Sequence, residues 1–385
     1  MLDLFKFTAL AMTALPLAAS AGSVDLLVGS YTQGERPGLY AYRFDTASGR
    51  LDARPWQQLR LDNPSWLVVC PEQSHVYAVN ENGPGARDPV GRASALSLDG
   101  QHRLTLRNQV STLGQHPTHA TLSPDGRYLL VANYSVAADP GGTLAVLPIA
   151  GDGTLQPVTQ LSSYQASHVD RKRQRSAHLH SVNFAPDGKT AYVADLGGDR
   201  VYAYRYAPQA NAEQPLQPAK TPFLALPPGS GPRHLVFDVE GRHAYLTLEM
   251  AGQVAVLDVA TDGTLALRTL VNLFAPGFAG DNGGGALHLS ADGRFLYAIN
   301  RGTDNHLVAF AVTADGGLKP LQRRATDGRL PREFAIDPTG RFVLVAAQGD
   351  DRIVVIARDP ATGRLGKTLQ TVEVAAPSDL KFLRP

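Results

Sequence analysis

The chain of 385 residues has one cysteine, few aromatic residues and almost no net charge. Cys70 alone can form no internal disulfide and excludes a cysteine-rich zinc site. Lys and Arg total 36 against 35 Asp and Glu, so the broad basic surface that nucleic acid or an anionic membrane would need is not expected. Beyond the N-terminus, no segment approaches the roughly 18 apolar residues of a membrane-spanning helix. We therefore expect no nucleic-acid partner and no membrane span.

The first 21 residues have the features of a secretory signal peptide. Lys6 supplies a short basic region, residues 7–18 are mostly small or apolar, and Ala19-Ser-Ala21 fits a cleavage site. Asp3 is unusual in such a segment, and the alternative is a cytoplasmic N-terminus. We expect cleavage after residue 21 and a periplasmic or secreted mature chain of residues 22–385, or a cytoplasmic protein if the segment is not a signal.

The 37 glycines and 27 prolines coincide with an internal repeat. Each copy has an apolar segment, a turn of the Pro-Asp-Gly type and a second segment with alternating Val, Tyr and Leu, which is typical of a β-hairpin. The copies recur at intervals of about 50 residues, the length of a propeller blade. The last turn positions are Gln73, Gly126, Gly188, Gly241, Gly293 and Gly340.

A further strand-like segment follows each hairpin and occurs seven times, whereas complete hairpins number six. The missing hairpin is divided between the ends of the chain: residues 377–382 match a first strand, and residues 25–31 match a second strand. Pairing these two would close a ring and leave no exposed sheet edge. We predict an all-β, seven-bladed β-propeller with four-stranded blades, interrupted by one insertion at residues 156–177. Two separate domains are the alternative, but no linker or change of composition supports them.

Because each hairpin is antiparallel, the starts of the first strands and the ends of the second strands lie at the same rim of a propeller. Many polar residues occupy these positions, and we expect them to meet at one central mouth. The candidates at strand starts are His178, His180, Arg233, His288 and Arg332. The candidates at strand ends are Glu81, Asn133, Glu249 and Arg301.

These residue types predict a site for an anion and for proton transfer. Arg233, Arg301 and Arg332 can bind a carboxylate or phosphate and stabilise an oxyanion. His180 and Glu249 can transfer protons, because a histidine titrates near neutrality and a glutamate pKa responds to its neighbours. The alternative is structural: inter-blade ion pairs for the arginines and channel lining for His180. The remaining candidates, predicted to bind substrate, are His178, His288, Glu81 and Asn133.

The insertion contains a basic run, Arg171-Lys-Arg-Gln-Arg175, immediately before His178. A solvated loop is the simpler interpretation. The alternative is a rim that attracts anionic substrates.

Several motifs of this chain resemble the lactonase family of seven-bladed propellers, typified by the propeller-type 6-phosphogluconolactonases. The resemblance covers the whole mature chain. It implies a catalytic set of His180, Arg233, Glu249 and Arg301. The segments that carry it include Val28-Gly-Ser-Tyr-Thr32, Asn63-Pro-Ser-Trp-Leu67, His178-Leu-His-Ser-Val-Asn-Phe184, Gly229-Ser-Gly-Pro-Arg-His234 and Ala298-Ile-Asn-Arg-Gly302.

The resemblance implies hydrolysis of a sugar-derived lactone, either similar to 6-phosphogluconolactone or an unphosphorylated aldonolactone, without a cofactor or a bound metal. If the chain is exported, the unphosphorylated lactone is favoured. Two alternatives stay open: a non-catalytic envelope propeller that binds a small anion or a protein, and an enzyme of the muconate-lactonizing type. Glu333 and Ala347 stand where the family usually has Asn, which bears on substrate choice. We expect a monomer.

Overall fold

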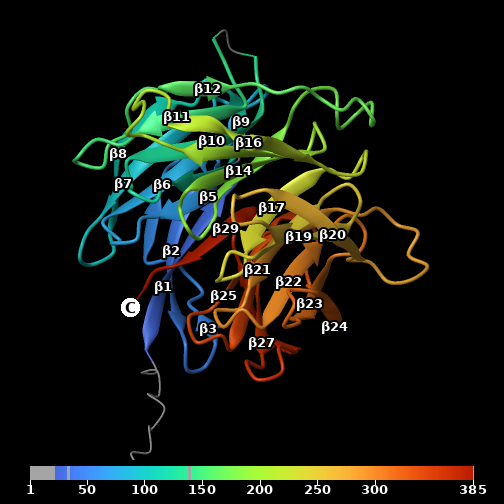
Figure 1. Ribbon diagram of the computed structural model, residues 1–385. Helices are drawn as coiled ribbons and strands as arrows, with labels where there is room; N and C mark the ends of the chain where they lie inside the picture. Colours follow the sequence, from blue (N-terminus) through green and yellow to red (C-terminus); the bar gives the residue numbers. More distant parts are fainter. Residues whose placement is uncertain (1–21, 33–34, 138–139, 385) are drawn as a thin grey trace, which may run out of the picture.

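The computed structural model describes residues 22–32, 35–137 and 140–384, so the expected signal peptide lies outside the described residues. Within these ranges, 29 strands and one 3₁₀ turn form seven antiparallel sheets arranged around a common centre (Figure 1). The predicted all-β, seven-bladed propeller is confirmed. No helix in the described part of the chain is long and apolar enough to cross a membrane.

Each blade is one sheet whose strands follow in chain order from the centre outwards, except where the ring closes. The first blade contains β29 (Pro377–Phe382), β1 (Ser23–Ser30), β2 (Leu39–Asp45), β3 (Arg50–Leu51) and β4 (Gln57–Leu59). The second contains β5 (Pro64–Val69), β6 (His75–Asn80), β7 (Arg92–Leu98) and β8 (Leu104–Ser111). The third contains β9 (Gln115–Leu122), β10 (Tyr128–Ser135), β11 (Leu144–Pro148) and β12 (Gln160–Ser162).

The remaining four blades are formed without interruption by the second half of the chain. The fourth contains β13 (Leu179–Phe184), β14 (Thr190–Asp195), β15 (Arg200–Tyr206) and β16 (Leu216–Ala225). The fifth contains β17 (Pro232–Phe237), β18 (His243–Leu248), β19 (Gln253–Val259) and β20 (Leu265–Asn272). The sixth contains β21 (Gly284–Leu289), β22 (Phe295–Asn300), β23 (His306–Val312) and β24 (Leu318–Ala325). The seventh contains β25 (Pro331–Ile336), β26 (Phe342–Ala347), η1 (Gln348–Asp350), β27 (Arg352–Arg358) and β28 (Leu365–Glu373).

The two ends of the chain meet in the first blade, as predicted. β1 pairs antiparallel with β29, with Leu26 opposite Phe382 and Val28 opposite Leu380. Asp379 of β29 also accepts a 2.6 Å hydrogen bond from the backbone N–H of Leu67 in β5, so the C-terminal strand is bonded to the next blade as well. The inner strands β29, β5, β9, β13, β17, β21 and β25 each pack against the next one around the ring.

The hydrophobic core is divided into seven layers, one between each pair of neighbouring blades. The layer at the closure contains residues from β1 and β2 on one side and from β26 and β27 on the other. There Phe44 and Phe342 make an edge-to-face contact with ring centroids 5.7 Å apart. Most of the burial thus depends on neighbouring blades being in contact, and a single blade would expose both of its apolar faces to water.

A hydrogen bond from a tyrosine to a glycine links neighbouring blades at four of these layers. The tyrosine lies in the second strand of one blade, and its hydroxyl donates to the carbonyl of a glycine in the outer turn of the next blade. These glycines have φ between 71° and 81°, a conformation that other residues adopt only with strain. The pairs are Tyr77 with Gly153, Tyr192 with Gly263, Tyr245 with Gly316 and Tyr297 with Gly363.

We expect Tyr245→Phe to lower the free energy of unfolding by about 1–2 kcal/mol, because the buried Gly316 carbonyl loses its partner. The hydroxyl of the buried Tyr42 has no hydrogen bond to any described residue, so Tyr42→Phe is the matched control and should change stability little. Urea unfolding of both variants measures the difference. Equal stability of the two variants would show that the blade-to-blade hydrogen bond contributes nothing.

Candidate active site

A β-bulge near the start of each inner strand shapes the centre of the ring. In β9, β13 and β25 the bulge leaves Thr118, His180 and Arg332 without a partner opposite them in the second strand. A bulge re-aims the side chain of the extra residue. All three of these side chains line the central cavity.

The cavity has a volume of about 350 Å³, and the residues that line it are all of charged or polar types. Inner strands, the ends of second strands and the insertion all contribute to it, so residues far apart in the sequence meet there. It is lined by Glu81, His116, Thr118, Tyr134, Arg173, His180, Glu249, Arg301 and Arg332. Of the residues predicted from the sequence, the structure brings His180, Glu249, Arg301, Arg332 and Glu81 to this cavity.

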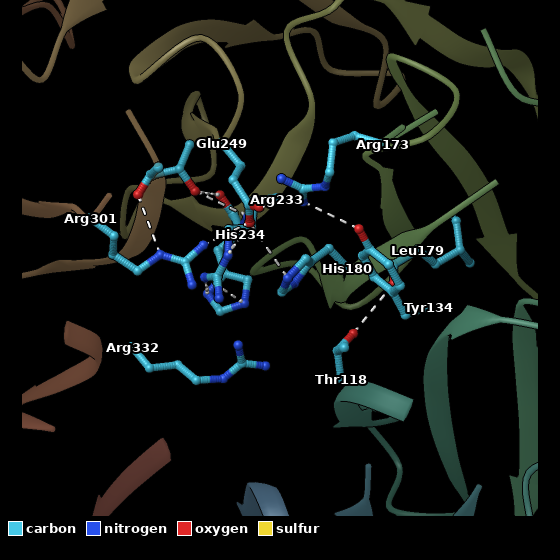
Figure 2. A network of polar contacts seen from close by, with 12 residues as sticks. Thr118, Tyr134, Arg173, Leu179, His180, Arg233, His234, Glu249, Arg301 and Arg332 are labelled. Atoms are coloured by element: carbon cyan, nitrogen blue, oxygen red, sulfur yellow. Dashed lines mark hydrogen bonds and ion pairs between the residues drawn. The ribbon is translucent and has the colours of Figure 1, made fainter. Parts of the chain in front are cut away.

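Glu249, directly after β18, is surrounded by three arginines (Figure 2). Its Oε2 accepts hydrogen bonds from Arg233 Nε at 3.0 Å and from Arg301 Nη2 at 2.9 Å. Its Oε1 accepts one from Arg173 Nη2 at 2.6 Å. Burial alone would raise the pKa of Glu249, but the charges of Arg301 and Arg233 outweigh burial and hold that pKa well below its usual range. The carboxylate is therefore a structural anion and a poor proton acceptor.

His180 lies beside this cluster in a neutral state. Burial lowers the pKa of His180 well below its usual value, and the positive charge of Arg233 lowers it further. The Nε2 atom is 3.8 Å from Glu249 Oε2, beyond hydrogen-bonding distance. The Nδ1 atom is buried and has no hydrogen-bond partner among the described residues. A neutral imidazole has one nitrogen with a lone pair, and neither ring nitrogen of His180 has a hydrogen bond to a described residue, so His180 keeps an unused proton acceptor.

A second ion pair faces Glu249 from across the ring. Arg332 Nη2 is 3.0 Å from Glu81 Oε2, and the hydroxyl of Tyr31 donates to the same oxygen at 2.6 Å. Burial disfavours the charged form of Arg332, but the neighbouring Tyr31 and Glu81 outweigh burial and raise its pKa. Burial raises the pKa of Tyr31 well above its usual value, so its proton stays in place. Arg332 is thus a permanent cation held in a fixed position.

Arg233 is not part of the cavity lining. Its side chain is 1% exposed and supports Glu249 from below. Burial and the nearby Arg301 lower its pKa to about 9, which still leaves it charged at neutral pH. Beneath it, the rings of His234, His119 and Trp66 pack against each other with centroids 4.1–5.5 Å apart. The His234 ring contacts the Arg233 guanidinium, with Nδ1 3.2 Å from Nη1, and helps to exclude water from it.

Besides Arg233, three predicted residues stay out of the cavity lining: His178, Asn133 and His288. His178 stacks on the ring of Tyr134 at 4.3 Å and bonds through Nδ1 to its carbonyl at 2.6 Å. The buried side chain of Asn133 donates to the carbonyls of two loop residues, Thr112 and Gly142, and so holds the end of its strand.

His288 bonds through Nε2 to Glu333 Oε1 at 2.7 Å, close to the floor of the ring. Glu333 is 1% exposed and Ala347 is fully buried. Neither side chain lines the cavity. The two departures from the family pattern therefore alter the packing around the site and do not change its lining.

Four residues that line the cavity were given no specific role from the sequence: Arg173, Tyr134, His116 and Thr118. For Arg173 a signal existed, because the basic run leads directly to His178, but nothing in the run distinguished this arginine from its neighbours. In the structure Arg173 lines the cavity, which favours the rim interpretation of the run for this one residue.

The cavity holds a net positive charge. Arg173, Arg233, Arg301 and Arg332 face two carboxylates, Glu81 and Glu249, and among the residues that the structure describes no other carboxylate pairs with these arginines. An anion, or a group that becomes one during a reaction, is therefore favoured there. In the described part of the chain no cluster of three or more His, Cys, Asp or Glu residues stands close enough to hold a metal ion.

The chain is similar along its whole length to proteins of known fold. The family model "Lactonase, 7-bladed beta-propeller" matches residues 25–382. A 6-phosphogluconolactonase of Formosa agariphila is 32% identical over 364 residues, which cover 93% of this chain and 99% of the relative. A 6-phosphogluconolactonase of Bacillus subtilis is 30% identical over 362 residues, covering 92% and 97%. The solved structure of a periplasmic gluconolactonase of Pseudomonas aeruginosa is 52% identical, with a TM-score of 0.91 and coverage of 94% of this chain and 99% of the other.

The buried histidines make the fold sensitive to acid. Burial lowers the pKa values of His119, His180 and His234 well below the usual value. The unfolded chain takes up protons near pH 6.5 and the folded chain does not, so the stability of the fold decreases as the pH drops below about 6.5. We expect the midpoint temperature of thermal unfolding to be lower at about pH 5 than at about pH 7.5. His119→Phe removes one of the buried histidines and should make this difference smaller.

His168→Asn is the matched control, because His168 is exposed in the insertion. This variant should keep the pH dependence of the unmodified protein. A midpoint that does not change with pH in the unmodified protein would contradict the expectation.

Proposed function

Because this chain belongs to the lactonase family of seven-bladed β-propellers, we propose that it hydrolyses the ester bond of a sugar-derived lactone in the central cavity. The observation that carries the proposal is a neutral histidine with an unused lone pair, His180, at a cavity lined by arginines. This pairing matches the two needs of ester hydrolysis: a base for the attacking water and positive charge for the oxyanion.

In the proposed mechanism His180 acts as the general base. It takes a proton from a water molecule as the water oxygen attacks the carbonyl carbon of the lactone. The carbonyl oxygen becomes an oxyanion in the tetrahedral intermediate. When the bond to the ring oxygen breaks, the imidazolium of His180 returns its proton to that oxygen. The products are a hydroxyl group and a carboxylic acid, which releases its own proton to water.

Arg301 and Arg332 supply the positive charge for the oxyanion. Each of them uses Nη2 to bond a glutamate, and the Nη1 of each has no hydrogen bond to any described residue. A guanidinium in a partly dehydrated cavity stabilises a developing negative charge more strongly than water does. These two arginines therefore serve both to bind the lactone carbonyl and to lower the barrier to attack.

Glu249 and Arg233 act by positioning. Glu249 fixes the direction of Arg301, and its low pKa argues against a role as proton acceptor. Arg233 holds Glu249 from below and keeps His180 neutral by its charge. Between the two proton-transfer candidates of the sequence, the electrostatics favour His180.

The substrate follows from the proposed location of the protein. Residues 1–21 have the pattern of a signal peptide, and the similar Pseudomonas aeruginosa protein is described as a periplasmic gluconolactonase. We propose that the mature chain acts in the periplasm. Sugar phosphates are made inside the cell, so an unphosphorylated aldonolactone is the favoured substrate.

We expect His180→Gln to reduce kcat by about 10²–10⁴-fold, the usual contribution of a general base, with a smaller change in KM. The assay follows acid release from glucono-δ-lactone in a pH-stat, with the uncatalysed rate subtracted. His75→Gln is the matched control, because His75 begins β6, at the opposite end of that strand from Glu81. Equal rates for the His180 variant and the control would refute the role of His180.

The pH dependence of kcat/KM gives a separate test. A base must be deprotonated to act, so the rate falls as the pH drops through the pKa of His180, which burial and Arg233 lower. We expect the acid limb of the profile well below about pH 6.5, the usual histidine value. Arg233→Gln removes a positive charge, raises the pKa of His180 and should move this limb to higher pH. A shift in the opposite direction would contradict the assignment.

A further inference from the structure

The insertion at residues 156–177 is held firmly at the edge of the cavity. The side chain of Gln174 is fully buried and donates from Nε2 to the carbonyl of Leu196 at 2.9 Å. Asp170 Oδ1 accepts the backbone N–H groups of Lys172 and Arg173 at 2.7 and 2.8 Å. Gln174 Oε1 in turn accepts the N–H of Asp170 at 3.1 Å. The backbone that carries Arg173 is therefore fixed against the fourth blade.

Arg173 uses only part of its hydrogen-bonding capacity. A single nitrogen, Nη2, donates to Glu249 at 2.6 Å and to the hydroxyl of Tyr134 at 3.2 Å. Nη1 and Nε have no hydrogen bond to any described residue, and the side chain is 44% exposed. Three N–H donors of a fixed, permanently charged group are thus available at the cavity.

Arg173 lies on the opposite side of His180 from Arg332 (Figure 2). If Arg301 and Arg332 bind the lactone carbonyl, a substrate that extends past His180 brings its far end to Arg173. Glu249, which forms the one ion pair with Arg173 found among the described residues, is already shared with Arg233 and Arg301. One carboxylate therefore balances only part of the positive charge of three arginines, and a neutral substrate would add no negative charge.

We infer that Arg173 is a specificity-determining residue, which recognises a carboxylate or phosphate group at the end of the lactone remote from the ester. The inference rests on the proposed lactonase function and changes its substrate: lactones that carry such an acidic group are preferred to the neutral aldonolactone. Carboxylate and phosphate share the planar or multi-oxygen geometry that a guanidinium binds with two hydrogen bonds. Tyr134 is a positioning residue that directs the guanidinium.

The test compares three lactones: neutral glucono-δ-lactone, glucaro-1,4-lactone with a free carboxylate, and 6-phosphogluconolactone with a phosphate. Charge-assisted hydrogen bonds to a remote group are worth about a tenfold change in kcat/KM or more. We expect Arg173→Gln to lower kcat/KM for whichever acidic lactone fits, mainly through KM, by that factor more than it lowers kcat/KM for the neutral lactone. The better acidic substrate shows which anion the cavity accepts.

Lys172→Gln is the matched control, because it removes an exposed positive charge from the same loop without touching the cavity, and it should change no substrate by more than about twofold. Tyr134→Phe, which keeps the ring and removes the hydroxyl, should give a smaller loss in the same direction as Arg173→Gln. An equal loss on neutral and acidic lactones would overturn the inference, since Arg173 would then only support Glu249.

Binding of open-chain glucarate and of inorganic phosphate, measured by calorimetry, separates this inference from the proposed function. If no lactone is hydrolysed but Arg173→Gln weakens binding of either anion by about tenfold, anion recognition by Arg173 is supported and the proposed lactonase activity is refuted. If lactones are hydrolysed and neither anion binding nor the preference for acidic lactones depends on Arg173, the activity survives and the inference fails.

Discussion

One buried carboxylate, Glu249, allows several guanidinium groups to share a cavity of about 350 Å³. Without its charge, Arg173, Arg233 and Arg301 would repel each other in a region that excludes water, where such repulsion is strong. The same charge fixes the direction of each guanidinium. The positive potential that keeps His180 neutral, and that would stabilise an oxyanion, therefore depends on an anion that does not itself exchange protons.

The scaffold makes this arrangement possible by bringing the arginines from different parts of the ring. Arg233 comes from the fifth blade, Arg301 follows the second strand of the sixth, and Arg332 begins the seventh. Their backbones are fixed by inter-blade packing, so the side chains lose little further freedom when they pair. The bulges add the last element of control, because they turn residues such as His180 into the cavity at a point where a regular strand would direct them into a sheet face.

The fold could be predicted from the sequence because the repeat recurs in every blade. The turn glycines, the alternating strands and the divided hairpin at the two ends were sufficient to predict seven blades and their closure. The common rim of the repeated hairpins likewise made it possible to predict that five residues meet at one mouth: His180, Glu249, Arg301, Arg332 and Glu81. A position at the rim does not show whether a side chain lines the cavity or stabilises nearby backbone. Asn133 and His178 lie at the rim, but each bonds to a backbone carbonyl of a neighbouring segment. The position of Arg173 in the cavity could not be predicted, because the irregular insertion has no repeat that indicates which of its side chains points inwards.

The pairing of β29 with β1 also has a consequence in time. The innermost strand of the first blade is the last strand to be synthesised, so that blade stays incomplete until the whole chain has emerged. The layer between the first and seventh blades cannot form earlier either. Ring closure is therefore a late step of folding, which has to wait for the last strand of the chain.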